Sequence, residues 1–137
     1  MATTYGGSCH CGSVSFTATT DNRKIIVCNC SICRKKGARH LRVTPAEFTL
    51  LSGEDSLSKY QFGSKTASHY FCRRCGIAPF TKPRSAPNMI NINIQCLDTP
   101  ALEDCNFEIV HFDGQNWEQA LAALNQALSP DALSGNR

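Results

Sequence analysis

Short segments in which hydrophobic and polar residues alternate dominate the chain. In residues 90–94 isoleucine and asparagine alternate, so that one face of the segment is apolar and the other is polar. A period of two residues predicts a half-buried β-strand. Residues 107–112 predict another strand, which the turn Asp113-Gly114 follows. These patterns favour a fold built mainly from β-strands.

The other segments predict shorter strands and one helix. β-forming residues, separated by breaks such as Pro45 and Gly53, predict strands at residues 13–18, 24–27, 41–43, 48–51, 57–62 and 69–71. Near the C-terminus, apolar residues recur at helical spacing: Trp117, Leu121, Leu124 and Leu128. Asn116 is the expected N-cap with Gln119 three residues later, and Pro130 is the expected stop. We expect this helix to pack on a sheet.

Length and composition set the fold class and exclude several functions. A chain of 137 residues with 42% hydrophobic and 18% charged residues predicts one compact domain over residues 1–130, with a flexible tail over residues 131–137. The formal net charge of +3 is too small for the basic face of a nucleic-acid-binding protein. No apolar segment has the length of a membrane helix and no secretory signal is visible, so we expect a cytoplasmic protein.

Cysteines carry the candidate chemistry of the chain. Seven of the nine fall into three tight clusters: Cys9 and Cys11; Cys28, Cys30 and Cys33; and Cys72 and Cys75. In a reducing compartment, clustered cysteines are more often metal ligands than disulfides, and an odd total does not suit a fully oxidised framework. The clusters therefore predict metal binding.

The two cysteine pairs predict one closed zinc site. In an extended segment, residues i and i+2 project to the same face, so the sulfurs of Cys9 and Cys11 could reach one ion. Gly76 would allow backbone amides to turn toward the sulfurs of Cys72 and Cys75. Because four thiolates complete a tetrahedral site, we assign Cys9, Cys11, Cys72 and Cys75, here called the first cysteine set, to a structural zinc.

The second cysteine set, Cys28, Cys30 and Cys33, predicts another zinc with one position open. Three thiolates leave a tetrahedral vertex for water or a substrate, as in catalytic zinc sites. Alternatively, His40 or Cys96 supplies a fourth ligand and makes the site structural.

Cations cluster in sequence beside the second cysteine set. Positive side chains here could offset the negative charge of three thiolates. The cations are Arg34, Lys35, Lys36, Arg39 and Arg42. Arg34 and Lys35 could also hold the carboxylates of an anionic substrate, or the run could form an ordinary solvated face.

The remaining histidines and cysteines receive default roles. His10 is expected to point to solvent, and His69 is expected to pack within a strand. His40 is the histidine to test as an acid, a base or a metal ligand. Cys96 is expected to be a small buried hydrophobic residue, and Cys105 to be structural.

Three cysteine motifs and two later segments resemble the glutathione-dependent formaldehyde-activating family. They are C-H-C-G-x-V-x-F (residues 9–16), C-N-C-S-x-C-R-K-x-G (28–37), H-Y-F-C-R-x-C-G (69–76), C-L-D (96–98) and F-D-G-x-N-W (112–117). The resemblance covers nearly the whole chain in order. It implies a mainly β, Mss4-like fold, with a structural zinc on the first cysteine set and a labile or catalytic zinc on the second.

The resemblance also implies an activity, the condensation of glutathione with formaldehyde to S-hydroxymethylglutathione, which is a carbon–sulfur lyase reaction in reverse. On this hypothesis the second zinc takes a substrate thiol as its fourth ligand and lowers its pKa, and the thiolate attacks the aldehyde. The alternative is a non-enzymatic zinc module that binds glutathione, another thiol or a protein partner. A methionine sulfoxide reductase would need a reactive cysteine in a late strand, and Cys96 lacks the expected surroundings.

Overall fold

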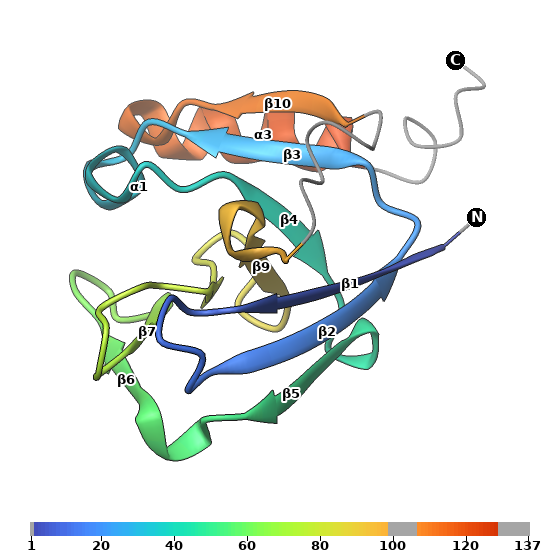
Figure 1. Cartoon of the computed structure of the whole chain (residues 1–137). Coiled ribbons are helices and arrows are strands. Elements are labelled where there is room, and N and C mark those ends of the chain that lie inside the picture. Colours follow the sequence, from blue (N-terminus) through green and yellow to red (C-terminus); the bar gives the residue numbers. More distant parts are fainter. Residues whose placement is uncertain (1, 99–106, 129–137) are drawn as a thin grey trace.

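The chain folds into two β-sheets that pack face to face (Figure 1). The computed structural model describes residues 2–98 and 107–128. The predicted tail over residues 131–137, the predicted helix stop at Pro130 and the isolated Cys105 all lie outside the described residues. No helix in the described part of the chain is long and apolar enough to cross a membrane.

The smaller sheet has three antiparallel strands in the order β1-β2-β5. Their bounds are β1 (Thr3–Ser8), β2 (Ser15–Thr20) and β5 (Phe48–Ser52). The sequence patterns did not predict β1, because glycines interrupt its alternation. A Cβ atom on Gly7 would lie 2.4 Å from the Phe16 ring, so a side chain is excluded there by the packing of the neighbouring strand.

The larger sheet has seven strands in the order β10-β3-β4-β9-β8-β7-β6. Their bounds are β3 (Lys24–Cys28), β4 (His40–Val43), β6 (Leu57–Tyr60), β7 (Ser68–Cys72), β8 (Phe80–Lys82), β9 (Ile90–Asn93) and β10 (Glu108–Phe112). β10 pairs with β3 in parallel and the other neighbours are antiparallel. Only β8 was not predicted; it is three residues long, too short for a periodic signal.

The main hydrophobic core lies between the two sheets. Phe16 from the smaller sheet joins Leu41 and Val43 of β4 and Ile90 and Ile92 of β9. The apolar face predicted for residues 90–94 is therefore confirmed. Because side chains alternate across a strand, the residues of β4 and β9 between these positions point to the opposite face of the sheet.

The predicted C-terminal helix is confirmed as α3 (Trp117–Ala127). It packs through Leu124 against Ile26 of β3 and Phe112 of β10, and it lies along these strands in Figure 1. Asn116 occupies the N-cap position but its side chain makes no cap hydrogen bond. Instead its amide donates to Asp113, which ties the helix start to the preceding turn.

A short helix, α1 (Ser31–Lys36), was not predicted. It buries no residue and therefore leaves no apolar periodicity in the sequence. Neighbouring residues cap both of its ends. At the start, the Cys30 sulfur accepts a hydrogen bond from the Cys33 amide, and at the end Gly37 adopts a left-handed conformation. Short 3₁₀ turns also occur at Pro45–Glu47, Glu54–Ser56, Ile94–Cys96 and Gly114–Asn116.

Two candidate metal sites and an adjoining pocket

The first cysteine set brings together the turn after β1 and, from the second pair, the last residue of β7 and the turn that follows it. Its four sulfur atoms all lie within 4.8 Å of one another. The Sγ atom of Cys11 is 3.7 Å from that of Cys9 and 3.7 Å from that of Cys72. A tetrahedral ion with metal–sulfur bonds of about 2.3 Å separates its sulfur ligands by about 3.8 Å. The donor set therefore fits a tetrahedral zinc ion.

Backbone amides support this set. The amide of Val14 donates to the Cys9 sulfur at 3.3 Å, and that of Arg74 donates to the Cys72 sulfur at 3.4 Å. The expectation that Cys9 and Cys11 lie on an extended segment is wrong. They occupy a turn, closed by the hydrogen bond from the Gly12 amide to the Cys9 carbonyl at 3.2 Å, and this turn directs both sulfurs to one point.

The second cysteine set lies where β3 ends and α1 begins. The sulfurs of Cys28, Cys30 and Cys33 lie within 4.8 Å of one another. The Cys30 amide donates to the Cys28 sulfur at 3.4 Å, and the Cys33 amide donates to the Cys30 sulfur at 3.5 Å. Hydrogen bonds from Cys28 and then Cys33 lower the pKa of the Cys30 thiol well below its usual range, which favours a thiolate able to bind a metal ion.

In the described part of the chain, no fourth ligand joins the second cysteine set as a single cluster. The Nε2 atom of His40 is 3.5 Å from the Cys33 sulfur, so His40 touches the set at one member. Cys96 belongs to the core between the sheets, and its sulfur faces the Ala78 carbonyl at 4.0 Å. Its burial agrees with the expected role as a small hydrophobic residue.

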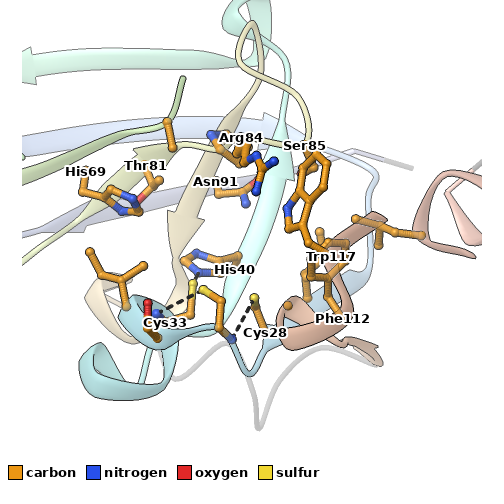
Figure 2. A pocket seen from close by; sticks show the side chains of 18 of the residues that line it. Cys28, Cys33, His40, His69, Thr81, Arg84, Ser85, Asn91, Phe112 and Trp117 are labelled. Carbon is orange, nitrogen blue, oxygen red and sulfur yellow. Dashed lines mark hydrogen bonds between the residues drawn. The ribbon is translucent and has the colours of Figure 1, made fainter. Parts of the chain in front are cut away.

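A cavity of about 490 Å³ opens beside the second cysteine set (Figure 2). One wall is apolar and includes Ile26, Phe112, Trp117 and Leu124. Phe62 also lines the cavity. The volume is in the range of small-molecule sites.

The opposite wall is a row of polar side chains, one from each of four neighbouring strands. In the strand register, Arg42 of β4 pairs with Asn91 of β9, Asn91 pairs with Thr81 of β8, and Thr81 pairs with His69 of β7. All four are buried and line the cavity. We call them the polar row. It occupies the sheet face opposite the hydrophobic core.

Two buried imidazoles face the cavity without a complete set of hydrogen bonds. His40 is 3% exposed and His69 is 7% exposed, and the Nδ1 atom of each has no partner. Burial, with a further contribution from the positive charge of Lys36, lowers the pKa of both to about 4. Both rings are therefore neutral near pH 7, and each can offer a hydrogen-bonding atom to a ligand.

The loop after β10 covers the second cysteine set. A Cβ atom on Gly114 would lie 2.5 Å from the Cβ atom of Cys30 and 2.9 Å from the Cys28 sulfur. The Asn29 amide group donates to Asp113 at 3.0 Å, which fixes the loop against the cysteine turn. The absence of a side chain at Gly114 is thus a requirement of this contact.

Comparison with known proteins agrees with this arrangement. The sequence profile of the family described as glutathione-dependent formaldehyde-activating enzyme matches residues 4–112. The chain belongs to this family. The resemblance seen in the cysteine motifs is therefore confirmed, and the family supports glutathione-dependent activation of formaldehyde as the general activity.

A solved structure gives a similar fold. The chain resembles a Rhodobacter sphaeroides protein whose crystal structure was determined as a structural-genomics target, with a TM-score of 0.68 and 31% sequence identity. The similarity covers 77% of this chain and 99% of that chain. The relative is therefore covered almost completely.

The remaining predicted residues, Arg34, Lys35 and His10, do not line the cavity. Arg34 and Lys35 are exposed on α1 and do not line it, so their contact with substrate carboxylates stays a prediction. His10 is exposed, as expected.

Sequence reasoning counted Arg42 only as a nearby cation and did not single out Arg84, although both line the cavity. The alternation of residues 40–43 could have placed His40 and Arg42 on one face. No comparable local signal marks Arg84.

Proposed function

We propose that the protein is a zinc-dependent carbon–sulfur lyase that joins a thiol such as glutathione to an aldehyde such as formaldehyde. The observation that carries this proposal is the position of the second cysteine set, which has three sulfur ligands and lies on the wall of a cavity. Family membership supports the same activity.

We assign one zinc to each cysteine set. On the first set it would be structural, because four sulfurs complete the tetrahedral shell. On the second set, bound zinc would supply a Lewis acid that lowers the pKa of a substrate thiol and so favours a thiolate near neutral pH. All eight cysteines in the described part of the chain are free to act as ligands, and we place the protein in a reducing compartment such as the cytoplasm, where clustered cysteines remain available to metal ions.

The reaction is balanced without an oxidant or a reductant. The thiol loses its proton and its sulfur forms a bond to the aldehyde carbon. The electron pair of the carbonyl π-bond moves to oxygen, which takes up a proton. The apolar wall with Phe112 and Trp117 would limit water around the reacting groups.

His40 is our candidate for proton transfer or ligand positioning. Its Nε2 atom contacts Cys33, and its Nδ1 atom has no protein partner. Water in the cavity is the other possible proton carrier. The charge of Lys36, whose amino group donates to Thr81 at 3.2 Å, would offset part of the negative charge of the three thiolates.

An NMR assay of glutathione and formaldehyde exchange tests the proposal. Zinc-loaded protein should accelerate formation of S-hydroxymethylglutathione above the spontaneous rate, and Cys30→Ser should abolish the acceleration. Cys96→Ala, which removes a cysteine outside the cavity, is the matched control and should keep it. A spontaneous rate with bound glutathione would instead support a non-enzymatic thiol-binding module.

A further inference from the structure

Arg42 is a buried cation with no acidic partner among the described residues. It is 9% exposed, and its guanidinium donates to Asn91 Oδ1 at 3.1 Å and to Ser85 Oγ at 2.7 Å. Burial lowers its pKa to about 10, so it remains charged near pH 7. Among the described residues, no aspartate or glutamate lines the cavity. Because buried charges are normally paired, this guanidinium suits an anionic ligand.

A second cation stands at the same end of the cavity. The guanidinium carbon of Arg84 is 3.7 Å from the centroid of the Trp117 ring, a contact that restrains the long side chain. Figure 2 shows Arg84, Ser85 and Asn91 together, away from the second cysteine set. Two guanidinium groups on one side of a cavity suit a carboxylate, since their planar donors match its two oxygens.

Strand β4 carries one residue near the sulfurs, His40, and one at the arginine end, Arg42. His40 contacts Cys33, with 3.5 Å between Nε2 and Sγ, and Arg42 follows two residues later on the same face. Two residues of extended strand span about 6.8 Å. A ligand whose sulfur lies at the second cysteine set must therefore reach past His40 before a carboxylate can contact Arg42.

We propose that Arg42 and Arg84 form a carboxylate-binding subsite that selects extended thiols whose carboxylate is many bonds from the sulfur. The placement of the sulfur rests on the proposed function. Thr81 and the unpartnered Nδ1 of His69, in the same row across the sheet as Arg42, offer hydrogen bonds to amide groups of such a ligand. Glutathione has this form, whereas in N-acetylcysteine the carboxylate is too close to the sulfur to span the distance.

Calorimetric titration of zinc-loaded protein tests the subsite. Glutathione should bind about tenfold more tightly than its diethyl ester, in which both carboxylates are neutralised. Arg42→Gln should weaken glutathione binding by about tenfold or more, because a buried charge pair is truncated, and leave ester binding unchanged. N-acetylcysteine binding should not depend on Arg42. An equal loss for glutathione and the ester would indicate a packing role and overturn the subsite.

Matched variants locate the effect. Arg34→Gln and Lys35→Gln test the other candidate placement of the carboxylate, at exposed positions of α1. If the carboxylate binds at Arg42 instead, glutathione affinity should stay within about twofold of the unmodified protein. If either reproduced the loss, the carboxylate would bind there and not at Arg42. Thermal unfolding and zinc content should show that Arg42→Gln is folded. If it is not, Arg84→Gln, at an exposed position, carries the test and should weaken glutathione more than the ester.

S-methylglutathione separates this inference from the proposed function, because it keeps both carboxylates and has no thiol. Its binding should also weaken in Arg42→Gln. Arg42-dependent binding without any acceleration of the aldehyde reaction would refute the lyase and keep the subsite. Equal acceleration and equal affinity for glutathione and its diester would refute the subsite and keep the lyase.

Discussion

The two cysteine sets share the same local geometry, short turns with amide-to-sulfur hydrogen bonds, but they have different surroundings. In each, a short turn directs backbone amides to sulfur atoms. The first set has four sulfurs and contacts a small core that contains Val14. The second has three, and it opens to a cavity with neutral imidazoles and two arginines. If both sets bind zinc as proposed, the number of sulfur ligands and the surroundings, more than the turn itself, would distinguish a stabilising site from a reactive one.

The largest expected effect comes from breaking the first set. Cys72 is fully buried, and Cys72→Ser would remove one of four ligands that join the turns after β1 and β7. A structural zinc site contributes on the order of 10 kcal/mol, which is comparable to the stability of a whole domain. We expect little folded protein by circular dichroism. As the control, the Cys96→Ala protein, which loses a buried cysteine outside both sets, should still fold. A folded Cys72→Ser protein with an unchanged melting temperature would contradict a structural role for the first set.

Breaking the second set should have a functional effect with little loss of fold. Cys30→Ser leaves two sulfurs in the open site, so we expect one zinc fewer per chain by metal analysis and no thiol binding by calorimetry. The melting temperature should stay within a few degrees of the unmodified protein. Retention of two zinc ions per chain in this variant would sink the assignment.

The smallest expected effects come from one glycine beside each set. In Gly114→Ala the added methyl group would overlap Cys30 and Cys28, so zinc affinity at the second set should fall by about tenfold while the first set keeps its ion. Gly76 has φ of +81° and open space around its Cβ position, so Gly76→Ala should cost about 1 kcal/mol of stability by backbone strain. Competition with a chelator and thermal unfolding measure the two effects. Equal zinc loss in Gly114→Ala and Gly76→Ala would contradict the expected difference between the two cysteine sets.

Cysteine spacing and strand alternation were sufficient to predict much of the fold and the two cysteine clusters that could hold metal ions. Cys28, Cys30 and Cys33 lie within six residues of one another in the sequence, and their sulfurs also lie close together in the structure. The face that carries Ile90 and Ile92 was also predicted. The mainly β fold with a C-terminal helix is confirmed, whereas the Mss4-like architecture stays a prediction.

The polar wall of the cavity could not be predicted in the same way. Asn91 alternates with isoleucines, a pattern that does not distinguish a solvent face from a cavity wall. Its burial depends on the register of β4, β9 and β8, which is set by non-local pairing. The side chain of Arg84 is restrained by its contact with the ring of Trp117, which lies in the distant helix α3. Such relations are absent from any short window of sequence.

The loop that carries Gly114 also gives the chain an order of assembly. The last ligand of the first set is residue 75, whereas the cover of the second set comes from residues 112–117. In a chain that emerges from the ribosome N-terminus first, all four cysteines of the first set therefore precede the loop that covers the second. If the first set binds zinc as proposed, all four of its ligands are synthesised before β10, whereas the second set gains its cover only when β10 is added beside β3.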